Sequence, residues 1–322
     1  MSEISRRNFL LTGAGTAAMG LGGSVAFYPS TALASIRETG FYSYKIGSDI
    51  EVISIYDGIF SPPVTDGFVQ GATIQEVEEA LKSAGYAGDT IPLEFAFTVL
   101  KTGGETILID AGTGGQMVPS AGLASIGFKN AGIDPSDISK VLLSHMHADH
   151  SYGLLDKDTK EQIFPDAEIL VNETEYRFWT NEGNNAKLNE RFRAQAERHQ
   201  ATFPGFKNVT LFQDGATDLA PGVTAVAAPG HTIGHTAFHV NSGGDELMLI
   251  GDAVLTPALF VNNPEWQIAV DADKEAAKET RYRLMQKVVD DNMTVAGYHF
   301  GFPNSGKIEK DGKGFAFIPT SQ

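Results

Sequence analysis

The segment His145–His150 is the feature that most constrains the fold of this 322-residue chain. It reads His-x-His-x-Asp-His and directly follows an apolar run that we expect to be a buried strand. Side chains at positions i and i+2 of an extended loop point the same way, so His145 and His147 can bind one ion. Asp149 and His150 follow a bend and can serve a second ion. Imidazole and carboxylate are ligands of zinc, manganese, iron and cobalt. The segment therefore predicts a metal site at a strand end.

Three residues far along the chain extend this pattern. His231 lies in Pro-Gly-His-Thr-Ile-Gly-His, Asp252 ends an apolar run, and His299 ends another. We expect all three at strand ends, with Asp252 placed to bridge two ions. The chain contains no cysteine, which excludes disulfides, thiolate metal sites and cysteine nucleophiles. The alternative, a polar loop of solvated histidines, suits a single histidine better than a cluster with distant matches.

The remaining pattern alternates apolar runs with helical segments. The capping box of Thr73 and Glu76 starts one helix, and Tyr56-Asp57-Gly58 predicts a turn. Expected strands lie in Phe41–Tyr56, Phe95–Leu100, Thr106–Asp110, Val141–Ser144, Glu168–Val171, Val209–Ala228, Glu246–Ile250 and Val295–Tyr298, and expected helices at Thr73–Ala84, Ala186–Gln200 and Asp273–Val289. Glu105–Gly112 and Glu246–Ala253 resemble one another, which indicates a duplicated β/α unit. No linker-like tract interrupts residues 35–322, so we predict one domain there.

Residues 1–34 are typical of an export leader. Arg6 and Arg7 precede an apolar, glycine-rich run, and Ala32-Leu33-Ala34 forms a small-x-small cleavage site. The arginine pair indicates the twin-arginine route, and hence a periplasmic or secreted protein. The apolar run is short for a permanent membrane span. The alternative is a soluble helix that carries an arginine pair by chance.

The charge of the chain restricts its partners. The formal net charge is -16 and the pI is near 4.8. Such a chain repels phosphate backbones and anionic lipid surfaces, so we expect neither nucleic acid nor a membrane as a partner. The hydrophobic fraction of 42% is ordinary for a folded protein.

Taken in chain order, these motifs resemble the metallo-β-lactamase superfamily. The resemblance covers nearly all of residues 35–322 and implies an αββα sandwich, an α/β fold of two mixed sheets flanked by helices. It implies that His145, His147 and His231 bind one metal. It implies that Asp149, His150 and His299 bind the other, with Asp252 bridging. The segment Asp110-Ala111-Gly112 matches an early motif of the family, and Asp110 would orient a ligand histidine.

A closer resemblance is to the methyl parathion hydrolase family and its exported relatives, which include lactone and aryl-ester hydrolases. It is carried by the leader, by Phe178-Trp179, and by Phe302-Pro303 with Gly312-Lys313-Gly314-Phe315. The resemblance implies that Trp179, Phe192 and Leu255 line the substrate pocket. Met117 stands where the family has a further aromatic residue, and this departure bears on organophosphate activity. Core or lid packing is the alternative role for each of these side chains.

The resemblance implies a hydrolase of lactones, aryl esters or phosphotriesters that acts on an uncharged, apolar small molecule. Two divalent ions, zinc first and manganese, cobalt or iron as alternatives, would share a bridging hydroxide as the nucleophile. Asp149 would pass a proton to the leaving group. The alternatives are an iron-dependent sulfur dioxygenase, a β-lactamase, and a non-catalytic binding module. Family analogy would allow a homodimer.

Overall fold

The computed structural model describes residues 37–312 and 314–320. The predicted leader at residues 1–34, with Arg6 and Arg7, lies outside the described residues. Within these ranges, no helix has both the length and the apolar character needed to cross a membrane.

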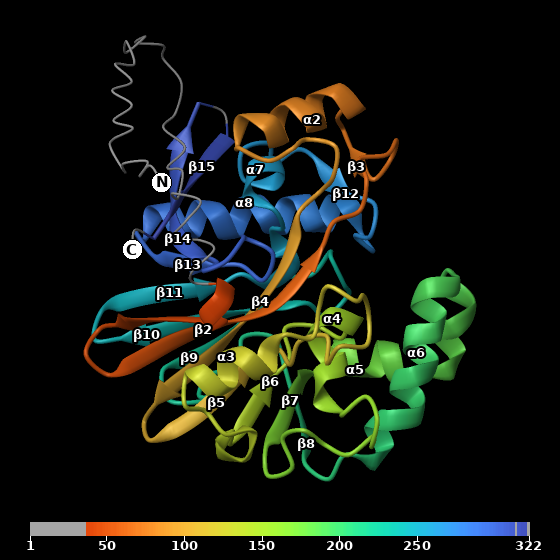
Figure 1. The fold of residues 1–322 in the computed structure, drawn as a ribbon, viewed down its shortest axis with the longest axis vertical. Coiled ribbons are helices and arrows are strands. Elements are labelled where there is room, and N and C mark those ends of the chain that lie inside the picture. Colours follow the sequence, from red (N-terminus) through yellow and green to blue (C-terminus); the bar gives the residue numbers. More distant parts are fainter. Residues whose placement is uncertain (1–36, 313, 321–322) are drawn as a thin grey trace, which may run out of the picture.

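Two mixed β-sheets pack face to face (Figure 1). The first sheet has the order β1 (Phe41–Ile46), β2 (Ile50–Phe60), β4 (Leu93–Thr102), β5 (Glu105–Ile109), β6 (Lys140–Leu142), β7 (Glu168–Asn172) and β8 (Val209–Phe212). The second has the order β15 (Gly314–Pro319), β14 (Ser305–Asp311), β13 (Thr294–Ala296), β11 (Asp245–Leu249), β10 (Thr236–Ser242) and β9 (Val223–Ala227). Strands β5 to β8 are parallel, as are β11 and β13, and the other neighbours are antiparallel. A ribbon of β3 (Val69–Gln70) and β12 (Gln267–Ile268) stands apart.

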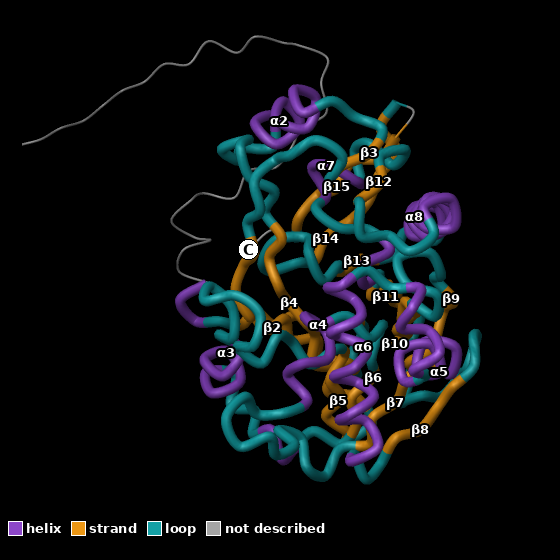
Figure 2. Tube along the Cα trace, turned by 90° about the vertical axis from the view of Figure 1, so that its right-hand side faces the viewer, coloured by secondary structure: helices purple, strands orange, loops and turns teal. Residues whose placement is uncertain are grey.

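Helices cover the outer face of each sheet, as the two views show (Figures 1 and 2). The helices of the first sheet are α3 (Ala124–Asn130), α5 (Glu173–Thr180) and α6 (Glu190–Thr202). Those of the second are α2 (Ile74–Ser83), α7 (Pro257–Phe260) and α8 (Lys274–Asp290). The short helix α4 (Ala148–Ser151) follows β6. Short 3-10 helices lie at Pro135–Asp137, Tyr152–Leu154, Glu182–Lys187, Phe203–Gly205 and Gly251–Ala253.

Strand alternation explains why the strands are almost continuously apolar. Val52 and Leu100 point between the two sheets, where they meet Phe238 of the second sheet. Their neighbours Ile53 and Val99 point the other way, into the layer beneath α3, α5 and α6. Each strand side chain therefore enters one of two cores, because successive residues face opposite sides of a sheet. This arrangement confirms the expected αββα sandwich.

Two local expectations differ from the structure. Tyr56-Asp57-Gly58 is a β-bulge inside β2 rather than a turn. Asp57 is fully buried there, and its carboxylate accepts hydrogen bonds from the backbone N–H and hydroxyl of Thr113, both at 2.7 Å. The helix expected at Ala186–Gln200 is divided into a 3-10 segment and α6, because Asn189 caps a new helix by accepting from the N–H of Phe192.

Candidate metal centre

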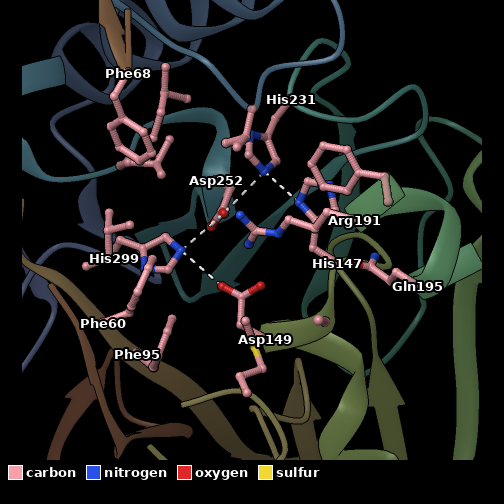
Figure 3. A pocket seen from close by; sticks show the side chains of 17 residues that line it. Phe60, Phe68, Phe95, His147, Asp149, Arg191, Gln195, His231, Asp252 and His299 are labelled. Carbon is pink, nitrogen blue, oxygen red and sulfur yellow. Dashed lines mark hydrogen bonds and ion pairs between the residues drawn. The ribbon is translucent and has the colours of Figure 1, made fainter. Parts of the chain in front are cut away.

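Polar side chains from both sheets meet at one edge of the sandwich (Figure 3). The segment His145–His150 follows β6 of the first sheet. Asp252 follows β11, His299 follows β13, and His231 lies in the loop that leads into β10 of the second sheet. The carboxyl ends of the parallel strands β5 and β6 and of β11 and β13 lie at this edge. The structure thus brings together all seven residues proposed as metal ligands.

The first group consists of His145, His147 and His231. One ring nitrogen from each lies within 4.8 Å of the other two. The Nε2 atom of His231 is 3.0 Å from Nδ1 of His147. All three rings are buried, and Nε2 of His145 has no hydrogen-bond partner among the described residues. Three converging imidazole nitrogens are a ligand set typical of zinc.

The second group consists of Asp149, His150, Asp252 and His299, whose ligand atoms also lie within 4.8 Å of one another. Asp252 is central, since its Oδ1 is 3.3 Å from Nε2 of His150 and its Oδ2 is 3.2 Å from Nε2 of His299. The same Oδ2 lies 3.4 Å from Nε2 of His231 in the first group. Asp252 therefore lies between the two groups, where a bridging ligand must be.

Several inward-facing atoms of this edge are buried and make no hydrogen bond, although Nε2 of His150 and Oδ1 of Asp252 lie at ion-pair distance. Nε2 of His145, Nε2 of His150 and Oδ1 of Asp252 have no hydrogen-bond partner among the described residues. Buried polar atoms are rarely left unsatisfied in folded proteins. Because these atoms converge on one small space and carry lone pairs, the residues present fit a pair of divalent cations.

A carboxylate and a carbonyl group behind the ligands orient two of the rings. Asp110 accepts from Nδ1 of His150 at 2.9 Å and from the N–H of Ser144 at 2.7 Å. This is the orienting position expected for Asp110. Nδ1 of His299 lies 2.9 Å from the carbonyl oxygen of Glu94. Such contacts fix which ring nitrogen faces a metal.

Sequence reasoning missed two further carboxylates. Asp271 contacts Nδ1 of His231 at 2.8 Å. Glu175 accepts from the N–H groups of Met146 and Gly234, each at 2.9 Å, and so holds the two histidine-bearing loops together. The sequence marks Glu175 only as part of the capping pattern Asn172-x-x-Glu175 at the start of α5, and no pattern marks either carboxylate as a member of the metal centre.

Charge in the centre is unevenly distributed. Burial, together with the neighbouring His150 and His147, lowers the pKa of His145 well below its usual value. Burial also lowers the pKa of His150, but the carboxylates of Asp252, Asp110 and Asp149 outweigh it and raise that pKa well above its usual value. These carboxylates thus favour a positive charge between them.

A cavity of about 590 Å³, with space open to solvent included, lies over the centre. Its walls are mainly apolar and include Phe60, Phe68, Phe95, Met117, Phe192 and Leu255. Arg191 is the only lysine or arginine among the lining residues, and its guanidinium extends into the cavity (Figure 3). Of the expected pocket residues, Met117, Phe192 and Leu255 therefore line the cavity.

Trp179 does not line the cavity, contrary to the expectation. Its side chain is only 2% exposed, and its Nε1–H donates to Oε1 of Glu175 at 2.7 Å. The indole instead packs edge-on behind His147, with ring centroids 5.6 Å apart. Glu175 and Trp179 lie one helical turn apart on α5, so this hydrogen bond turns the indole inward.

The other histidines lie outside the ligand set. Nε2 of His235 accepts from the N–H of Asp252 at 3.0 Å. His199 is buried beneath the centre, with Nε2 2.7 Å from the carbonyl oxygen of Met146. His239 lies on β10 beside Glu246, at 3.2 Å.

Comparison with known proteins agrees with this geometry. A family model described as the metallo-beta-lactamase superfamily matches residues 96–299. The solved structure of AidC, described as a dizinc quorum-quenching lactonase in complex with a product, superposes with a TM-score of 0.80 at 26% identity, over 88% of this chain and 99% of that one. The hydrolase AbOPH, described as in the beta lactamase superfamily, gives a TM-score of 0.80 at 25% identity, over 88% and 98%. A probable metal-dependent hydrolase from Staphylococcus aureus gives 0.68 at 22% identity, over 87% and 99%. No curated protein sequence matches significantly.

Proposed function

Because the chain belongs to the metallo-β-lactamase superfamily and is a metal-dependent hydrolase, we propose that it uses two divalent ions to cleave an ester-type bond in an uncharged, apolar small molecule. Zinc is the first candidate metal, with manganese, cobalt and iron as alternatives. The observation that carries the proposal is the convergence of seven ligand residues, five of which line an apolar cavity.

The chain's own residues would divide the work. His145, His147 and His231 would hold one ion, and Asp149, His150 and His299 the other, with Asp252 between them. When bound, such a pair acts as a Lewis acid and lowers the pKa of water towards neutrality.

Asp149 has a second role in the proposal. Its side chain is 15% exposed, whereas that of Asp252 is 4% exposed. Asp149 also lines the cavity, so its carboxylate can take a proton and deliver it to the leaving-group oxygen. The backbone carbonyl of Asp149 accepts from the hydroxyl of Tyr298 at 2.6 Å, which fixes this turn.

The cavity walls support the substrate class. Aromatic and aliphatic side chains surround the metal groups and would exclude water from the scissile bond. Of the three candidate bonds, lactones come first, since AidC is described as a lactonase. Aryl esters and phosphotriesters are the second and third candidates. Met117 stands where the methyl parathion hydrolase family has an aromatic residue, so an organophosphate would make one aromatic contact fewer here than in that family.

The test is a hydrolysis panel on protein purified without its leader. The protein is stripped with a chelator, assayed on acyl-homoserine lactones, aryl esters, methyl parathion and nitrocefin, and then reloaded with zinc, manganese or cobalt. We expect activity to disappear with the metal and to return with it. Undiminished hydrolysis by the metal-free protein would refute the proposal. Preferential nitrocefin turnover would indicate a β-lactamase, and oxygen consumption by an iron form would indicate a dioxygenase.

A matched pair of variants tests the metal centre directly. Asp252→Ala removes the central carboxylate, and Asp245→Ala removes an exposed carboxylate at the start of β11, the strand that precedes Asp252. We expect the first to lose at least one metal equivalent by elemental analysis and the second to keep both. Two equivalents and normal turnover in Asp252→Ala would contradict the bridging role.

We also propose export by the twin-arginine route, with residues 35–322 as the mature domain. Replacing Arg6 and Arg7 by lysine should leave full-length protein in the cytoplasm, whereas the unchanged leader should give a shortened periplasmic or secreted form. Fractionation followed by N-terminal sequencing measures both. Unaltered export of the double-lysine variant would contradict the route.

A further inference from the structure

Arg281 of α8 is the largest fully buried side chain among the described residues, with 0% exposure. Its Nε–H donates to the carbonyl oxygen of Ala253 at 3.3 Å, and Nη1 donates to that of Pro264 at 3.1 Å and to that of Trp266. The guanidinium carbon lies 5.2 Å from the ring centroid of Phe260. Burying a cation carries a large desolvation cost. The several contacts directed at this guanidinium therefore indicate that it has a specific role.

One edge of this guanidinium faces Asp271. Nη2 of Arg281 is 3.5 Å from Oδ2 of Asp271, and neither atom has a hydrogen-bond partner among the described residues. The other carboxylate oxygen, Oδ1, is the one that contacts Nδ1 of His231. The three side chains thus form a buried line from α8 to the first metal group, and all are at most 6% exposed.

The same guanidinium also contacts the turn that carries Asp252, which follows β11 of the second sheet. Ala253, whose carbonyl accepts from Nε, directly follows Asp252 in the 3-10 turn Gly251–Ala253. Arg281 therefore contacts the backbone beside the central carboxylate and, through Asp271, the ring of His231. It is positioned to hold two ligands from different loops in a fixed relation.

We propose that Arg281 is a positioning residue that sets metal affinity in the group His145, His147 and His231 by fixing Asp271 against His231. The ion pair holds the Asp271 carboxylate in place, and that carboxylate accepts the Nδ1–H of His231. The Nε2 lone pair of His231 is thereby directed at the centre. This inference rests on the two-metal site proposed above.

The experiment measures both metal dissociation constants by chelator competition in three variants. Arg281→Met removes the charge and the fork, Arg281→Lys keeps the charge but lacks the fork, and Asp271→Asn removes the acceptor charge with little change in size. We expect Arg281→Met and Asp271→Asn each to raise the dissociation constant of one of the two ions about 10–100-fold. The dissociation constant of the other ion should stay nearly unchanged. Arg281→Lys should weaken the same ion by less.

Two controls separate positioning from general loss of packing. Arg283→Met makes the same substitution at an exposed position of α8, and Leu284→Ala opens the buried face of α8 without touching Asp271. The first should leave melting temperature and metal binding unchanged. The second should lower the melting temperature and leave the ratio of the two dissociation constants at its original value.

A double variant tests whether Arg281 acts through Asp271. If it does, Arg281→Met in the Asp271→Asn background should add less than about threefold to the loss of affinity. Additive losses, unchanged constants in Arg281→Met, or the same selective loss in Leu284→Ala would overturn the inference. If Arg281→Met does not fold, unchanged constants in Arg281→Lys and Asp271→Asn would overturn it. Failure of the unmodified protein to bind two ions would instead overturn the proposed function.

Discussion

The pH dependence of folding should carry a measurable contribution from His199. The ring is buried on α6 and is 2.7 Å from the carbonyl oxygen of Met146. Burial lowers its pKa from 6.5 to about 4. The unfolded chain therefore takes up a proton near pH 6.5, whereas the folded protein takes it up only near pH 4.

The sign and size follow from this difference. The contribution of neutral His199 is fully present above pH 6.5 and is lost as the pH falls towards 4, because only the unfolded state is protonated in that window. At 1.36 kcal/mol per pKa unit, the unfolding free energy should lose about 2 kcal/mol by pH 5 and about 3 kcal/mol by pH 4 from this group.

Urea unfolding at pH 7, 6, 5 and 4 measures the effect in metal-free protein. His199→Gln removes the titrating ring, and its stability relative to the unmodified protein should improve by about 3 kcal/mol from pH 7 to pH 4. Gln195→Met is the matched control, because Gln195 donates to the same Met146 carbonyl at 2.7 Å but does not titrate. Its stability difference should be the same at every pH. A pH-independent difference for His199→Gln would refute the reasoning.

Three further predictions follow from the site. Asp110→Asn should weaken metal binding about 10–100-fold, measured by chelator competition, because Asp110 orients His150 at 2.9 Å; unchanged affinity would contradict this. Arg191→Glu should reduce kcat/KM for anionic aryl esters about tenfold more than for neutral ones. Arg193→Glu changes the same charge on the exposed side of α6 and should lower kcat/KM for both kinds of ester equally. Equal losses for anionic and neutral esters in Arg191→Glu would exclude a role for Arg191 in the cavity. Trp179→Phe should lower the unfolding free energy by about 1–3 kcal/mol without raising KM, since the indole donates to a buried carboxylate outside the cavity; a raised KM would restore Trp179 to the pocket.

The metal groups could be predicted from the sequence because most of their residues directly follow apolar strands, whose ends meet at one edge of a sheet. His145 and His150 lie in one short segment, and Asp252 and His299 each end an apolar run, so their convergence follows from strand geometry alone. The αββα architecture is implied by the family resemblance, and the apolar runs agree with it, since strands that are apolar on both faces need a layer of cover on each. The resemblance to a known family supplies the full division of the ligands between two ions, with Asp252 shared by both.

Other features depend on contacts that a linear pattern does not encode. Asp271 lies 40 residues from His231 in the chain, and only tertiary packing brings them together. The direction of the Trp179 indole is set by its partner Glu175, and similarity at one position says nothing about which way a side chain points. The Asp-Gly pair at Asp57 has the composition of a turn, yet burial beside Thr113 makes it a bulge.

The division of the ligands between the sheets has a consequence for the stability of the whole molecule. Four ligands follow a strand of the first sheet, and three belong to loops of the second. Each bound metal ion would therefore join two sheets that share no backbone hydrogen-bond ladder. Binding there is equivalent to a reversible cross-link across the sandwich. When the free metal concentration exceeds the dissociation constant, each further tenfold rise should add about 1.4 kcal/mol per ion to the free energy of unfolding. The resistance of the protein to unfolding would thus report how much metal its surroundings supply.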